Sequence, residues 1–197
     1  MIEDLTFLED GEYTTRSNVI RSISEELKQS TRTPWGAVSG YVADLRYDNY
    51  NKDNAFRKRI ASDILESGYV AGCTDVALAF IVLARELGIP TRYVETFDEK
   101  WLQDTNAHGI QGHIFVDVLV DGQWKAYEPK KGFTKDNNYT MNGRRYIEVG
   151  KGLDFSGVYI KENGVYRPEP TSLQSLEQIF NHWMKHRVLK PKIPSIH

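Results

Sequence analysis

The hydrophobic pattern of this chain changes its period at Gly88, and this change constrains the fold more than any other feature. Before it, Cys73–Leu87 is almost wholly apolar and long enough for a buried helix. Gly88 and Pro90 then supply the usual signals for a helix end. After them the apolar residues alternate, over Thr91–Phe97 and again over His113–Val120, as in strands with one buried face. A buried helix followed by such strands predicts an α+β fold.

A tight turn follows the second alternating segment and fixes a strand register. Asp121-Gly122 is a strong signal for a two-residue hairpin, so Gln123–Glu128 should return beside His113–Val120. If Val120 pairs with Gln123, Glu128 lies opposite Phe115 and diagonally from His113. Diagonal neighbours are about 7 Å apart at the backbone, which a glutamate side chain can span. The spacing therefore predicts that His113 and Glu128 meet on one face.

Helices are expected before this core and a mixed extension after it. The first helix should start after Ser17, the second at Thr33-Pro34, and the third should run through Phe56, Ile60 and Ile64 to end near Gly68. Beyond Pro129 the chain looks rich in loops, with a hairpin over Val158–Arg167. Thr171 and Gln174 form a capping box for a last helix, whose apolar face would comprise Leu173, Leu176, Ile179, Phe180 and Trp183.

Length and charge limit the classes of function. The chain has 197 residues, 12% of them aromatic, which suits a single domain over 1–197 with a substantial core. Its net charge of −2 does not favour nucleic acid or an anionic membrane as a partner. No apolar run is long enough to cross a bilayer. Because the acidic start Met1-Ile-Glu lacks the pattern of a signal peptide, we expect a cytoplasmic protein.

The chain contains one cysteine, so it can form no intramolecular disulfide and no cysteine-built zinc site. The polar segment Asp48–Asn54 lacks the glycine and the final glutamate of a calcium-binding loop. Neither a metal nor a cofactor is therefore expected.

That cysteine, Cys73, stands where the predicted helix begins. Helix N-terminal N–H groups and the helix dipole favour a thiolate there, which is the nucleophilic form. Gly72 leaves room for a substrate, and the backbone N–H of Cys73 could stabilise an oxyanion. The alternative is a small buried residue with no chemistry, which is common for a lone cysteine.

A nucleophilic cysteine needs a base and a group that orients the base. His113 and Glu128 can fill these roles because of their predicted register. Asp117 is the rival carboxylate, but it lies four residues from His113 along one strand, about 13 Å away. It is therefore expected to be a solvated or structural acid.

The order and spacing of these motifs resemble the transglutaminase-like superfamily. The resemblance lies in Gly72-Cys73-Thr74-Asp75, Leu87-Gly88-Ile89-Pro90, Gly112-His113 and Tyr127-Glu128-Pro129. It covers about residues 33–130, which leaves 131–197 as a C-terminal extension. Two positions depart from the usual pattern, because Glu128 stands where aspartate is usual and Phe115 where tryptophan is often found.

The resemblance implies a papain-like fold with a Cys73-His113-Glu128 triad. Members of this family cleave or exchange amide bonds through a thioester intermediate, so the implied substrate is an amide-bearing peptide or protein. We favour a peptidase or amidase over a transamidase, because water is always available whereas an amine must be selected. The alternative is a protein-interaction module that keeps the fold without catalysis.

Overall fold

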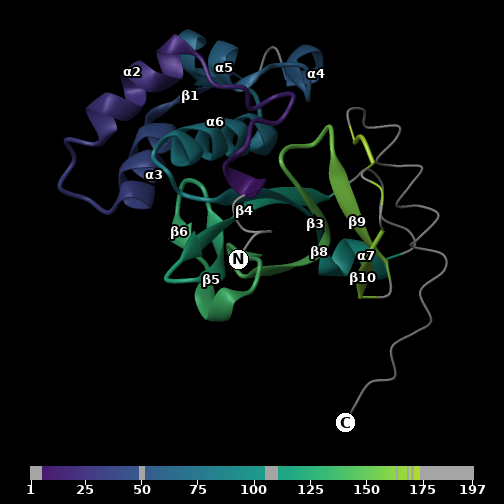
Figure 1. The fold of residues 1–197 in the computed structure, drawn as a ribbon. Helices are drawn as coiled ribbons and strands as arrows, with labels where there is room; N and C mark the ends of the chain where they lie inside the picture. The colour runs from purple at the N-terminus through teal and green to yellow at the C-terminus, as the bar shows by residue number, and fades with distance from the viewer. Residues whose placement is uncertain are drawn as a thin grey trace.

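The computed structural model describes residues 6–48, 52–104, 111–162, 164–167, 169 and 171–173. The longer helices gather on one side of an antiparallel sheet (Figure 1), so the prediction of an α+β fold is confirmed. The helical side is formed by α2 (Asn18–Leu27), α3 (Pro34–Asp44), α5 (Ala61–Ser67) and α6 (Cys73–Glu86). Short helical segments are η1 (Thr6–Leu8), α4 (Lys52–Ala55), α7 (Glu99–Gln103) and η2 (Lys135–Asn137).

Helix α6 forms the centre of the core. Every residue from Thr74 to Arg85 is buried, because α2, α3 and α5 pack around the helix and strands β3 and β4 lie against it. Gly88 ends the helix region with a φ of +78°, a conformation that suits glycine. The predicted buried helix is therefore confirmed.

The main sheet has eight strands in the order β10-β9-β8-β3-β4-β5-β6, and β7 pairs with β8. The strands are β3 (Thr91–Asp98), β4 (Gly112–Val120), β5 (Gln123–Glu128), β6 (Gly132–Phe133), β7 (Thr140–Met141), β8 (Arg144–Gly152), β9 (Val158–Glu162) and β10 (Val165–Tyr166). A separate parallel pair joins β1 (Arg46–Tyr47) to β2 (Tyr69–Val70), which ends shortly before Cys73. The three strands predicted between residues 91 and 128 and the hairpin of β9 and β10 are confirmed.

The third predicted helix is wrong over its first part. The structure has α4 and α5 with a break between them, and Arg57 lies in this break with a φ of +52°. Its guanidinium is buried against the Glu95 carboxylate, with Nη2 and Oε2 2.7 Å apart. A buried ion pair thus replaces the helical turn that the apolar spacing predicted.

The expectation of a loop-rich extension is also wrong in one respect, because β8 is a nine-residue strand paired with β3 inside the sheet. The predicted last helix lies outside the described residues from position 174 onward. Thr171, its predicted capping residue, forms a β-bridge with Val158, and Leu173 is buried in the core.

Candidate active site

Cys73 is the first residue of α6 and is partly buried. Gly72 caps the helix with extended backbone, and a Cβ at this position would meet no atom within 4 Å. The space beside the thiol segment is therefore open. Since the first N–H groups of a helix have no partner within it, a negative charge is stabilised at this end.

The loop before Cys73 is held by Asp75, a role that the sequence analysis missed. Asp75 Oδ2 accepts a hydrogen bond from the backbone N–H of Ala71 at 3.0 Å and lies 3.0 Å from Arg59 Nη1. The same Arg59 nitrogen donates to the carbonyl of Tyr69 at 3.1 Å. Burial raises the pKa of Asp75, against the lowering effects of Ala71 and Arg59. The signal in the sequence was an acidic residue in the first turn of an apolar helix.

The hairpin of β4 and β5 has the predicted register. Val120 pairs with Gln123, and Val116 pairs with Tyr127. His113 Nε2 lies 3.3 Å from Glu128 Oε1, so the two side chains meet as the spacing predicted. The second oxygen of Glu128 accepts the backbone N–H of Lys130 at 3.0 Å.

The imidazole of His113 is also positioned by aromatic packing. Its ring meets Phe115 edge-on, with ring centroids 4.9 Å apart, and Phe115 is completely buried. The carbonyl of His113 accepts a hydrogen bond from Thr96 Oγ1 at 2.7 Å. Phe115, one of the two departures from the family pattern, therefore supports the imidazole from the sheet side.

The thiol and the imidazole shift each other's charge state. Burial raises the pKa of the Cys73 thiol, but a hydrogen bond and positive charge from His113, with the backbone N–H of Ile114, outweigh burial and lower it. Burial lowers the pKa of His113, whereas hydrogen bonds and charges from Cys73 and Glu128 raise it to about 9. Both shifts favour a thiolate beside an imidazolium.

These groups line a small pocket of about 70 Å³. Tyr47 and Lys130 lie at its margin, with Lys130 Nζ 5.5 Å from the centroid of the Tyr47 ring. The pocket is lined by Tyr47, Cys73, Val76, His113, Ile114, Glu128, Pro129 and Lys130. A reacting group that enters it would meet the thiol, the imidazole and the carboxylate together.

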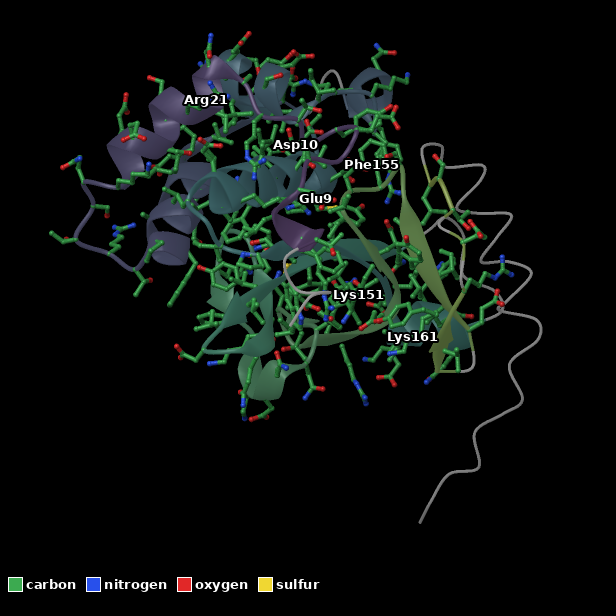
Figure 2. The ribbon with its side chains drawn as sticks, viewed as in Figure 1. Glu9, Asp10, Arg21, Lys151, Phe155 and Lys161 are labelled. Carbon is green, nitrogen blue, oxygen red and sulfur yellow. The ribbon has the colours of Figure 1, made fainter. Side chains whose placement is uncertain are left out.

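Asp117 takes no part in this pocket. It is buried and lies 2.9 Å from both Arg92 Nη2 and Lys151 Nζ, and it accepts the hydroxyl of Tyr139 at 2.9 Å. Lys151 and Lys161 lie on the side of the sheet away from the helices (Figure 2). Asp117 is therefore a structural acid, and the alternative of a solvated one is wrong.

A second buried ion pair, between Arg57 and Glu95, affects the Cys73 thiol. Arg57 binds Glu95 through Nη2, and Tyr93 donates its hydroxyl to Glu95 Oε2 at 2.9 Å. The charge of Glu95 acts to raise the pKa of Cys73. The sign of this pair in the sequence was an acidic residue, Glu95, inside a predicted strand.

No group of three His, Cys, Asp or Glu side chains in the described ranges is arranged to hold a metal ion. Within those same ranges, no helix is long and apolar enough to cross a membrane.

Comparison with known proteins supports the same fold. The chain is similar to the crystal structure of a proposed cysteine protease from Cytophaga hutchinsonii, with a TM-score of 0.57 and 18% identity. The match covers 77% of this chain and 47% of the other, so the chain spans about half the length of that protein. A solved structure of a TGase overlaps less, with a TM-score of 0.38, 15% identity and coverage of 64% and 34%.

No curated protein matches the chain. The sequence model of the transglutaminase-like superfamily, in contrast, matches residues 20–129, which is more than half of the chain. This segment runs from the first turn of α2 to the residue after Glu128, and it contains the thiol, the imidazole and the carboxylate of the pocket. The chain therefore belongs to the transglutaminase-like superfamily.

Proposed function

We propose that this protein is a thiol enzyme that cleaves or exchanges amide bonds through a thioester on Cys73. The observation that carries the proposal is the His113 imidazole, which interacts with the Cys73 thiol and also meets Glu128. A nucleophile, a base and an orienting carboxylate in contact are the groups that acyl transfer requires.

The chemistry follows from the charges of these groups. The Cys73 thiolate attacks the amide carbonyl carbon, and the backbone N–H of Cys73 stabilises the resulting oxyanion. The His113 imidazolium gives its proton to the amine nitrogen, the C–N bond breaks, and the acyl group remains on sulfur. Neutral His113 then takes a proton from water as the water attacks the thioester, the C–S bond breaks, and a carboxylic acid is released. This step restores the Cys73 thiolate and the His113 imidazolium.

An amine in place of water would complete the same cycle as a transamidation. We favour hydrolysis, and hence a peptidase or amidase, because no amine needs to be selected. The proposed substrates are peptides or proteins.

The test uses the single cysteine of the chain, which makes thiol alkylation specific. We expect the pH dependence of iodoacetamide labelling to give a Cys73 pKa below the ordinary value of about 8.5. His113→Ala should raise this pKa, because the stabilising imidazolium is lost while the helix end remains. A parent thiol that titrates like free cysteine, with no change in His113→Ala, would instead favour a non-catalytic interaction module.

A further inference from the structure

A second and larger hollow adjoins the pocket of Cys73. This groove has a volume of about 590 Å³, and its walls are α3 and the turn between β5 and β6. Lys130 lines both the groove and the pocket of Cys73, so the two spaces lie next to each other at this residue. Ser39 Oγ donates to the carbonyl of Pro129 at 2.7 Å and holds α3 against the turn. A substrate that extends from Cys73 past Lys130 would enter the groove.

The groove is positively charged, although the chain as a whole is negative. Its charged lining residues are three cations, Arg32, Lys130 and Lys131, and one acid, Asp44. The guanidinium of Arg32 lies against Gly40 of α3, where a Cβ would collide with Nη1. This glycine makes room for the cation beside the groove.

The cations are weakly compensated by the protein itself. Lys131 Nζ donates to the neutral side chain of Asn142 at 2.6 Å. Across the described part of the chain, none of the three groove cations has a carboxylate within 4 Å of its charged nitrogens. Burial lowers the pKa of Lys130, against the raising effects of Glu128 and Asp44. A further negative charge in the groove would stabilise all three cations.

We propose that this groove binds the part of the substrate adjacent to the reacting amide, and that this part is a peptide segment carrying carboxylate side chains. The proposal rests on the proposed function for the position of the amide. It adds a preference for acidic peptides, because their carboxylates match the charges of Arg32, Lys130 and Lys131.

The test measures binding to the Cys73→Ala variant, so that no turnover occurs. Three peptides of equal length, rich in glutamate, glutamine or lysine and labelled with a zwitterionic dye, are titrated by fluorescence anisotropy. We expect the glutamate peptide to bind at least about fivefold more tightly than the glutamine peptide, and the lysine peptide to bind weakest. Equal binding of the three, or no binding of any, would overturn the proposal.

Charge reversal locates the binding. In the Cys73→Ala background, Arg32→Glu and Lys131→Glu should each weaken binding of the glutamate peptide roughly threefold to tenfold. Arg21→Glu is the matched control, because it makes the same charge change at an exposed residue of α2 (Figure 2) that does not line the groove. It should change binding less than about twofold. If Arg21→Glu weakens binding of the glutamate peptide as much as the groove variants do, the preference comes from the overall charge of the protein and the proposed groove site is wrong.

Failure here is distinguishable from failure of the proposed function. Binding to Cys73→Ala does not depend on thiol activation, whereas iodoacetamide labelling does not depend on the groove cations. If the protein binds acidic peptides but its thiol titrates like free cysteine, the proposal for the groove stands and the proposed enzymatic function is refuted.

Discussion

The carboxylate of Glu128 is held by two contacts, although glutamate is unusual at this position of the family pattern. One of its oxygens faces His113 and the other accepts the N–H of Lys130, so the longer side chain is held at both ends of its carboxylate. The sequence predicted the first contact from the hairpin register. It could not predict the second, because that contact depends on the turn that follows Pro129.

The titration of His113 predicts a difference between two reactions of Cys73. His113 has a pKa of about 9, so its imidazolium is lost as the pH rises through this value. Amide cleavage should slow above about pH 9, because the leaving amine needs that proton. Alkylation of the thiolate should not slow, and neither should cleavage of an aryl ester, whose leaving group needs no proton. Parallel pH–rate profiles for the three reactions check this, and a shared decline would contradict it.

The two carboxylates near β4 should differ in what they do. Glu128→Gln should lower amide cleavage by at least about tenfold, because a misoriented His113 loses part of the benefit of proton transfer. Asp117→Asn should leave most activity but reduce the free energy of unfolding by about 1–3 kcal/mol, since Arg92 and Lys151 lose a buried charged partner. Initial rates of amide cleavage and urea unfolding of both variants are the measurements. A larger loss of activity in Asp117→Asn than in Glu128→Gln would show that Asp117 is the orienting acid.

At the scale of elements, the helices and strands with a clear hydrophobic period were the ones that the sequence predicted correctly. Helix α6 and strands β3 and β4 were predicted because each has a consistent apolar pattern. Strand β5 was predicted from the Asp121-Gly122 turn that precedes it. Strand β8 was missed because Glu148 and Lys151, which form a partly buried ion pair with each other, look like loop residues in the sequence. Its Gly150 also reads as a loop signal, yet a Cβ there would lie 2.9 Å from the carbonyl oxygen of Tyr159. Tertiary contacts across the sheet, which no local pattern contains, explain these residues.

The loop before α6 gives an element-scale prediction. Asp75→Ala should reduce the free energy of unfolding by about 3–5 kcal/mol, because Arg59 loses its buried partner and Ala71 N–H loses its acceptor. It should also slow labelling of Cys73 by iodoacetamide at a fixed pH, since the loop before the thiol is no longer held. Asp75→Asn keeps an oxygen for Ala71 and should be milder in both measurements. Equal effects of the two variants would mean that the Ala71 hydrogen bond contributes little.

At the scale of the whole molecule, the Arg57–Glu95 pair joins distant parts of the chain. Arg57 lies before α5, Glu95 lies in β3, and Arg57 Nη1 also donates to the carbonyl of Leu173 at 2.6 Å. The Arg57 guanidinium also lies 5.6 Å from the centroid of the Phe155 ring. This arrangement was beyond local sequence reasoning, because its four parts are separated by up to 116 positions.

Removing one member of that pair should affect both stability and the thiol. Arg57→Met should cost about 3–5 kcal/mol of unfolding free energy, because Glu95 is left as an unpaired buried charge. It should also raise the pKa of Cys73, since the negative charge of Glu95 is no longer neutralised. The double variant Arg57→Met/Glu95→Gln should recover part of the stability and restore the thiol pKa. Denaturant unfolding and alkylation profiles of both proteins provide the test. A double variant that is no more stable than the single variant, and whose thiol pKa is no lower, would refute this explanation.

The position of β3 also bears on how the chain is made. This strand has β4 on one side and β8 on the other, and both are synthesised after it. Until residue 152 has left the ribosome, one edge of β3 has no partner, and an unpaired edge can pair with another chain. The segment that the family model matches ends at residue 129, so it does not include the strand that covers this edge. The family core of this protein therefore depends on residues beyond the family match to protect it during synthesis.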